Sequence, residues 1–403
     1  MRRPLFGVDS RRVVRREGAD ARIAVVSRPA RLQSDRGNPR LKFLDRYLGI
    51  PAVAVLALPR RLRGARHVPA HWHTIGILLT AGIGDTVVAT GVLEDLRAAH
   101  PDARIVLFVT ANNASFARVL QTPDAVIELS VRRVWEAVRA VRAQQCDVIL
   151  DLGAWPRYAA ALSILSGADV TIGTRTRGQH RHFGYDIIVD HGREHEVEND
   201  RRLAAALGLI STTEPTITLP TDATAPLGVP YAVLHLWPGG ANFEERSWPV
   251  EQWRDLAGVL GARGLEIALT GGPGDVDETR AIVDAWNRTE LRVHNVAGGT
   301  WAESIAWLGF ATGVVSVNTG VMHVAAALGV PTVALNGPTS GTRWGPRGPF
   351  TRCVASPVVP DGYLDLGFER DERYRDCMAA ISVDRVMTAW DEVVGEAGVA
   401  GTA

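Results

Sequence analysis

The sequence predicts an α/β protein built from two doubly wound, Rossmann-like domains. From residue 73 onward, short β-branched apolar runs alternate with longer helical runs, which is typical of parallel sheets covered by helices on both faces. Residues 211–230 are rich in Thr and Pro and interrupt the alternation as a linker would, after which the pattern restarts. Several apolar runs end in glycine and polar residues, and ligands bind at the carboxyl ends of parallel strands. We therefore expect two domains that face each other across a central cleft.

The expected elements follow the chain in a regular order. In the first half we expect strands at residues 73–80, 104–109, 125–129, 146–152, 169–173 and 185–190, with helices at 85–100 and 195–209. In the second half we expect strands at 231–236, 265–272, 291–296, 314–317 and 332–335, with helices at 249–262, after Asp275, at 303–310 and around His323. The pattern weakens after residue 350, and a terminal helix is expected at 383–396. The predicted domains are 1–72, an N-terminal extension, then 73–228, 229–380 and a C-terminal helical segment, 381–403.

The N-terminal extension is rich in arginine, and residues 1–38 have too little apolar periodicity for an ordered element to be expected. Within residues 41–66, an apolar run at 50–58 is followed by several arginines. This run is too short to span a bilayer. Two interpretations stay open: a helix packed on the domain with a solvated basic end, or an interfacial helix whose arginines face anionic lipid.

Composition excludes several classes of function. The 403 residues are 46% hydrophobic and 22% charged, as in globular proteins, and the formal net charge is zero. No nucleic-acid partner is therefore expected. The three cysteines, Cys146, Cys353 and Cys377, are too few and too widely spaced for a disulfide framework or a zinc site. We expect a cytoplasmic protein, with peripheral attachment to the inner face of the membrane as the alternative for residues 41–66.

The turn after the first expected strand is the first candidate site. Residues 80–86 contain two glycines, which let the backbone approach a ligand closely, and Asp85 begins the following helix. Aspartate is also a favoured helix cap that needs no catalytic role, so a structural and a chemical interpretation both stand. The turn is not a P-loop, since no Gly-Lys-Ser/Thr follows, and it lacks the third glycine of a dinucleotide-binding fingerprint.

Two glycine-rich strand ends lie in the second half. Residues 236–249 contain a glycine pair followed by Arg246 and a tryptophan, which resembles an anion-binding loop. In the structural interpretation of this segment, Ser247 caps a helix and Pro249 occupies its first turn. Residues 269–275 form the other glycine-rich end, where Asp275 is either a cap in a tight turn or part of a site.

Residues 313–336 predict a complete strand–helix–strand unit. The first strand ends in Asn318-Thr319-Gly320, and the following small-residue helix contains His323. A helix N-terminus at the end of a strand favours an anion such as phosphate, because its N–H groups and its dipole point at the ligand. His323 is either a core histidine or a residue of that site. Together the four strand ends outline a cleft.

In order along the chain, these segments resemble glycosyltransferase family 9, the heptosyltransferase-like enzymes with the GT-B fold. The matching segments extend over roughly residues 74–350 and read GIGDTVVATGVLEDLRAAHPDARI, HEVENDRRL, PGGANFEERSWP, LTGGPGD and VNTGVMHVAAALGVPTVALNGPTS. The resemblance implies inverting transfer of a sugar, often a heptose, from a nucleotide-diphosphate donor such as ADP-heptose. It calls for no metal and no other cofactor. The expected acceptor is a hydroxyl of a glycolipid, a polysaccharide or a secondary metabolite.

The resemblance also implies roles for individual residues. Asp85 would be the base that deprotonates the acceptor hydroxyl, and Arg246 would neutralise the departing diphosphate. The donor would contact Gly239, Asn242, Gly272, Asp275, Gly299, Thr300, Asn318, Thr319, Gly320 and His323. In the first domain, the acceptor would contact Gly84 and a basic loop that contains Arg175, Arg177 and Arg181; a solvated loop without a binding role is the alternative.

Two positions depart from the family pattern. Asn318 stands where the family often has Asp, so a negative charge is missing beside the donor. Arg246 stands where the family usually has Lys, and a planar guanidinium fork is not equivalent to a point charge. Two other functions are therefore kept as alternatives: another GT-B activity, such as a nucleotide-sugar epimerase or hydrolase, and a non-catalytic nucleotide-sugar binding protein.

Overall fold

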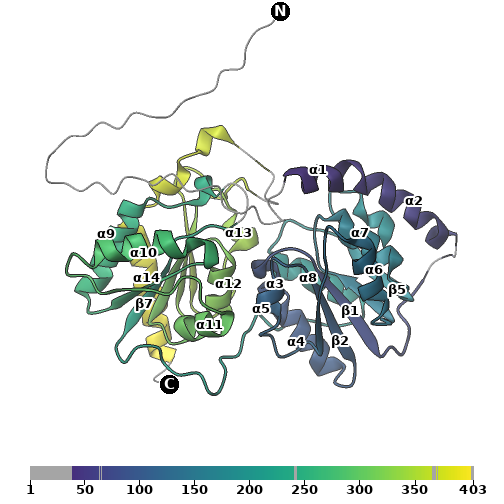
Figure 1. The fold of residues 1–403 in the computed structure, drawn as a ribbon, viewed down its shortest axis with the longest axis horizontal. Helices are drawn as coiled ribbons and strands as arrows, with labels where there is room; N and C mark the ends of the chain where they lie inside the picture. The colour runs from purple at the N-terminus through teal and green to yellow at the C-terminus, as the bar shows by residue number, and fades with distance from the viewer. Residues whose placement is uncertain are drawn as a thin grey trace, which may run out of the picture. The chain divides into compact units, whose positions relative to one another are not determined.

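Each half of the chain folds around one parallel six-stranded sheet (Figure 1). The computed structural model describes residues 39–62, 64, 66–239, 243–364, 369 and 371–400, and these belong to one compact unit. The first sheet has the strand order β3-β2-β1-β4-β5-β6, and the second has β12-β11-β10-β7-β8-β9. In both sheets the chain starts at the centre, runs to one edge, returns to the centre and fills the other side. The predicted doubly wound fold is therefore confirmed.

The first sheet is made of runs of β-branched and leucine residues; its four inner strands are buried along most of their length, whereas its two edge strands are partly exposed. Its strands are β1 Thr74–Leu79, β2 Arg104–Val109, β3 Ala125–Glu128, β4 Val148–Asp151, β5 Val170–Arg175 and β6 Ile187–Asp190. Its helices are α3 Ile83–Val88, α4 Thr90–Ala99, α5 Ala114–Ala117, α6 Val134–Arg142, α7 Arg157–Leu165 and α8 Glu196–Ala206. The single helix expected at 85–100 is divided at Ala89 into α3 and α4.

The second sheet repeats this arrangement. Its strands are β7 Tyr231–His235, β8 Glu266–Thr270, β9 Val293–Asn295, β10 Gly313–Val317, β11 Thr332–Asn336 and β12 Thr351–Ala355. Its helices are α9 Val250–Ala262, α10 Val276–Trp286, α11 Trp301–Gly309, α12 Gly320–Ala327, α13 Gly341–Trp344 and α14 Val383–Ala400. The terminal helix α14 lies against this sheet, where Trp390 packs over Gly313: a Cβ on Gly313 would be 2.8 Å from the indole. The exact domain boundaries stay predictions.

Among the residues that the structure describes, two helices rather than one precede the first sheet. They are α1 Pro39–Tyr47 and α2 Gly49–Arg61, and α2 packs on α7 by burying Val53 and Ala57 (Figure 1). The expectation of a solvated basic end is wrong for Arg60, because its guanidinium donates to the Thr171 hydroxyl at 2.7 Å and pairs with Asp186 at 3.2 Å. Among the described residues, no helix is long and apolar enough to cross a membrane.

The predicted linker is irregular but firmly attached. Residues 211–230 contain no helix or strand. The Asp95 carboxylate of α4 accepts hydrogen bonds from the backbone N–H groups of Thr212 and Thr213 at 2.8 and 3.0 Å, and Thr216 N–H donates to the Thr90 hydroxyl at 2.9 Å. These bonds hold the connection between the two sheets along helix α4.

Candidate active site

The Asp85 turn and the Asn318–Gly320 turn lie at the switch points of the two sheets. In the first sheet the order reverses between β1 and β4, and the Asp85 turn follows β1. In the second sheet it reverses between β7 and β10, and Asn318 to Gly320 follow β10. Ligands of open α/β sheets bind in the crevice outside the carboxyl ends of the strands at such points. The topology therefore gives each domain one candidate half-site.

The two half-sites meet through glycines at the starts of helices α3 and α12. A Cβ on Gly320 would be 2.8 Å from Cγ2 of Ile83, and a Cβ on Gly84 would be 3.0 Å from Cδ2 of His323. Side chains at these two positions would push the turns apart, so glycine is what permits the close approach. The Asp85 turn and the Asn318–Gly320 turn, which were expected on opposite sides of a cleft, are thus in direct contact.

Asp85 is the third residue of α3 and caps the start of that helix. Its Oδ2 accepts the Gly82 N–H at 2.8 Å, and the Thr86 hydroxyl donates to the Gly82 carbonyl at 3.0 Å. The interpretation of this residue as a cap is correct in kind, although Gly82 occupies the N-cap position and Asp85 caps from the third residue of the helix. A capping role is compatible with a catalytic role, because a carboxylate has further lone pairs and Asp85 is only partly buried. Its role as a base stays a prediction.

His323 is a buried, uncharged residue beside the Asp85 turn. Burial lowers its pKa to about 3, and the nearby His195 contributes in the same direction. The imidazole is therefore neutral near pH 7, so that it could serve a ligand as a hydrogen-bond partner but not as a cation. The core and site interpretations both fit this position, since the ring packs on Gly84 at the junction of the two half-sites.

Arg246 lies on the loop after β7, at the same sheet edge as the loop after β10. The residue belongs to a short 3-10 turn, Glu244–Arg246, is partly buried, and donates from Nη2 to the Gly239 carbonyl. Ser247 was expected to cap the following helix, but it does not. Its hydroxyl donates to the Phe243 carbonyl at 2.8 Å, and α9 begins after Pro249. Asn242 lies outside the described residues.

The remaining donor-site candidates have capping roles in the structure. Asp275 Oδ2 accepts the Gly272 N–H at 2.9 Å in the turn after β8. Thr300 and Glu303 cap α11 reciprocally, with the Thr300 N–H donating to the glutamate at 2.7 Å, and Gly299 precedes them on an exposed turn. Both turns follow neighbouring strands at one edge of the sheet. Nucleotide contacts at these positions stay predictions.

The basic loop of the first domain differs from expectation at one of its three arginines. Arg175 and Arg177 are exposed, and Arg175 pairs with Asp190 at 3.3 Å. Arg181, by contrast, is fully buried and paired with Asp151, whose other contacts include the Tyr185 hydroxyl at 2.6 Å. The grouping of Arg181 with a solvent-facing loop is therefore wrong, because the Arg181 guanidinium is paired with the buried Asp151 carboxylate at the end of β4.

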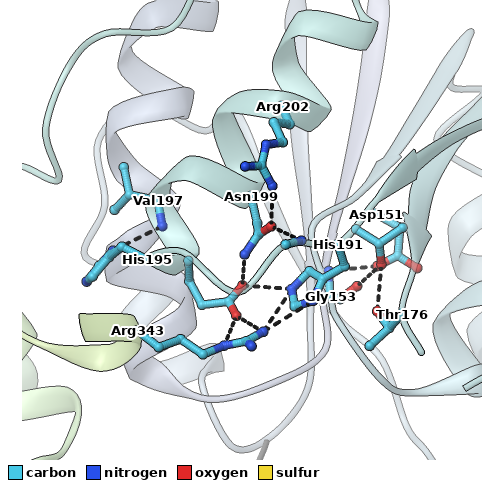
Figure 2. Close-up of polar contacts among 12 residues, drawn as sticks. Asp151, Gly153, Thr176, His191, His195, Val197, Asn199, Arg202 and Arg343 are labelled. Atoms are coloured by element: carbon cyan, nitrogen blue, oxygen red, sulfur yellow. Dashed lines mark hydrogen bonds and ion pairs between the residues drawn. The ribbon is translucent and has the colours of Figure 1, made fainter. Parts of the chain in front are cut away.

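Several polar residues near the site were not predicted. Arg343 of α13 points toward His191 and helix α8 of the first half, where its Nε donates to Glu196 at 2.6 Å (Figure 2). His195 Nε2 lies 2.9 Å from the Gly345 carbonyl. The HEVENDRRL segment was noticed as a helix and as part of the family resemblance, but nothing in the sequence identifies partners about 150 residues away.

The fold and the paired half-sites define a two-domain enzyme of the GT-B class. A family model for glycosyltransferase family 9 (heptosyltransferase) matches residues 134–360, which is more than half of the chain. The chain therefore belongs to glycosyltransferase family 9 and is a glycosyltransferase. Transfer is accordingly favoured over the epimerase, hydrolase and binding-protein alternatives.

Curated relatives and solved structures agree with this assignment. Lipopolysaccharide heptosyltransferase 1 of Escherichia coli K12 is 27% identical over 291 residues, or 65% of this chain and 87% of the relative. The enzyme of the same name from Salmonella typhimurium is 26% identical over 314 residues, covering 72% and 96%. The structure of the E. coli heptosyltransferase WaaC with ADP shares the fold, with a TM-score of 0.64, 22% identity and coverage of 79% of this chain and 99% of that one.

Proposed function

We propose that this enzyme transfers a heptose, or a closely related sugar, from an ADP-linked donor to a hydroxyl of a glycolipid, with inversion at the anomeric carbon and without a metal. The family assignment and the names of its relatives, lipopolysaccharide heptosyltransferases, support the sugar and the acceptor class. One structural relative, the E. coli heptosyltransferase WaaC, was solved with ADP, which supports the nucleotide. A polysaccharide or a secondary metabolite is the alternative source of the acceptor hydroxyl.

The proposed chemistry divides between the two half-sites. Asp85 accepts the proton of the acceptor hydroxyl as that oxygen attacks the anomeric carbon, and the bond from this carbon to the diphosphate oxygen breaks. The leaving diphosphate carries the developing negative charge. Arg246 and the N–H groups at the start of α12 stabilise that charge, and the neutral imidazole of His323 contributes a hydrogen bond. These groups supply what a divalent cation supplies in other transferases.

One observation carries the proposal more than any other. The N-terminus of α12 packs against the turn of Asp85 through Gly84 and Gly320, so a helix end suited to an anion lies next to a candidate base. An inverting displacement needs these two groups on opposite sides of one anomeric carbon. A binding protein would not need such a base, whereas a hydrolase would use it to activate water, so product analysis must separate transfer from hydrolysis.

The proposal is tested by product analysis. Purified protein is incubated with ADP-heptose, with and without a heptose-free lipopolysaccharide acceptor, and the nucleotide and sugar products are separated by chromatography. We expect ADP to be released only when acceptor is present, together with an acceptor extended by one sugar. A sugar altered without acceptor would instead indicate an epimerase, and free heptose a hydrolase.

We further propose that helices α1 and α2 rest on an anionic membrane surface, at the cytoplasmic face. Their outward sides expose large apolar residues, among them Tyr47, Leu48, Val55 and Leu58, each more than half exposed. Residues 39–66 contain seven Lys and Arg but one acid, Asp45, which is paired with Arg157 of α7. An apolar face bordered by cations is typical of helices that lie in the lipid headgroup region.

Vesicle binding tests this surface. We expect the protein to sediment with phosphatidylglycerol vesicles and much less with phosphatidylcholine vesicles, and the double variant Tyr47→Glu/Leu58→Glu to stay in the supernatant of both. Ile210→Glu is the matched control, since Ile210 is 87% exposed and lies just before the linker, away from α1 and α2 in the sequence. Equal sedimentation of the double variant and the wild type would contradict membrane contact through α1 and α2.

A further inference from the structure

Residues 340–346 form a short connection whose backbone is unusually constrained. Ser340 caps the single turn of α13 by accepting the Arg343 N–H at 3.3 Å. Gly345 ends the turn, and a Cβ there would contact the Gly341 carbonyl and lie 2.8 Å from the Cys353 sulfur. Pro346 follows and cannot continue the helix. The cap, the glycine and the proline therefore restrict the backbone of the three residues from Arg343 to Gly345.

Each of these three residues is held by a different group. The Arg343 side chain donates from Nε to Glu196 of α8 at 2.6 Å. The Trp344 carbonyl accepts a hydrogen bond from the Asn318 side-chain amide at 2.8 Å. The Gly345 carbonyl lies 2.9 Å from Nε2 of His195, the residue that caps α8. We call Arg343, Trp344 and Gly345, with Glu196, His195 and Asn318, the interdomain clasp.

The ion pair of the clasp is buried. The side chains of Arg343 and Glu196 are 3% and 9% exposed, and His191, 4% exposed, lies 3.2 Å from the guanidinium (Figure 2). The pKa of Glu196 is lowered because hydrogen bonding to His191 and the charge of Arg343 outweigh the effect of burial. Removing either member of so buried a pair would leave the other charge desolvated without a partner, which is strongly destabilising.

The imidazole of His195 is fixed in one tautomer. Nε2 faces a carbonyl oxygen, which can only accept, so Nε2 carries the proton, and Nδ1 accepts the Val197 N–H at 3.2 Å. Burial lowers the pKa of His195, which favours this neutral form. The same ring therefore caps α8 of the first half and holds the end of α13 of the second half.

Asn318 connects the clasp to the predicted donor site. Its amide nitrogen donates to the Trp344 carbonyl, and an aspartate in the same place would direct an oxygen at an oxygen. We propose that Asn318 is a positioning residue: it uses its amide to join the donor turn of β10 to the interdomain clasp, and through the clasp to helix α8. The departure from the usual Asp thus has a structural purpose in this chain.

The clasp ends close to the candidate base. Helix α8 packs on α3, which carries Asp85, and Asp200 lies one turn after Glu196 on α8. The pKa of Asp200 is raised well above its usual range by burial and by the nearby charges of Glu196 and Asp85. A continuous path of contacts therefore runs from Asn318 through residues 343–345 to α8 and the Asp85 turn. Loss of a contact at one end of this path should therefore increase local opening of the backbone at the other end.

Hydrogen exchange measured by mass spectrometry tests the coupling without any substrate. For Asn318→Asp, we expect exchange to become about fivefold faster or more, the effect of one lost hydrogen bond on a local opening equilibrium, in two segments: residues 339–345 and, in the other half, 195–199. Asn318→Ala, which removes the donor without adding charge, should show the same pattern more weakly. Arg343→Gln should in turn speed exchange at residues 318–323.

Two comparisons make the result decisive. Arg347→Gln is the control, because Arg347 pairs with Glu198 of the same helix at 2.7 Å but both side chains are about one third exposed. It should leave exchange at residues 318–323 unchanged. If both Asn318 variants alter exchange only in their own half of the chain, Asn318 is a local residue and the coupling is refuted.

The consequence for turnover rests on the proposed function. With ADP-heptose as donor, Asn318→Asp should lower kcat more than it raises KM, because it shifts the base side of the cleft as well as the donor turn. A wild-type protein inactive with this donor would count against the proposed function alone. The exchange measurement would still decide the coupling.

Discussion

Replacing Asp85 by Asn is expected to lower the rate of sugar transfer by a factor of about 10²–10⁴, the usual contribution of a positioned general base. The amide oxygen of Asn can still accept the Gly82 N–H that Asp85 accepts at 2.8 Å, so the start of α3 should keep its conformation. What is lost is the ability to take a proton from the acceptor hydroxyl. Turnover with saturating ADP-heptose and acceptor measures this directly.

Two further measurements distinguish loss of the catalytic base from a general disruption of the structure. ADP affinity, measured by calorimetry, should be nearly unchanged in Asp85→Asn, because the donor contacts that we propose lie in the second domain. Glu136→Gln, which removes an exposed acid from the first turn of α6 in the same domain, should leave transfer at the wild-type rate. Near-normal turnover of Asp85→Asn would remove Asp85 as the base and leave it as a helix cap.

Replacing Arg181 by Leu is expected to destabilise the protein by about 3–5 kcal/mol, because it leaves the Asp151 charge buried without a partner. Neither side chain of this pair is exposed at all. Burial would lower the pKa of Arg181, but the charge of Asp151 and the contact with Tyr185 outweigh it and raise the pKa, so the guanidinium stays charged. The free energy of unfolding in urea measures the effect.

The matched control lies on the same loop. Arg177 is exposed, and Arg177→Leu should change the free energy of unfolding by no more than about 0.5 kcal/mol. In the double variant Asp151→Leu/Arg181→Leu, much of the lost stability should return, since no charge is then left unpaired. If Arg181→Leu instead kept full stability and lost only acceptor binding, Arg181 would belong to the site after all.

Much of the fold could be predicted because both sheets are parallel and buried. Their strands read as continuous apolar runs, and β2 begins and ends at the predicted residues. The last strand, β12, was missed because Thr351 and Arg352 leave too short an apolar run in its five residues to distinguish a strand from a loop. Helices α6 and α7 were not predicted, although α7 buries six of its nine residues. An apolar run of that length does not by itself distinguish a helix from a strand.

The candidate site was predictable where its signal is local. Glycines and polar residues at strand ends indicated the Asp85 and Asn318–Gly320 turns, and strand order then placed both at switch points. Burial of charged residues was not predictable, since nothing near Arg181 or Arg60 in the sequence shows that Asp151 and Asp186 lie beside them. The interdomain clasp was missed for the same reason, because its contacts join segments about 150 residues apart.

The stereochemistry of the sugar transferred from ADP-heptose tests the central claim most directly. The wild-type enzyme is given this donor and a heptose-free lipopolysaccharide acceptor, and the new linkage is examined by nuclear magnetic resonance. We predict release of ADP, one added sugar, and an anomeric configuration opposite to that of the donor, as a single displacement assisted by Asp85 requires. A retained configuration, or consumption of the donor at the same rate without acceptor, would contradict the account.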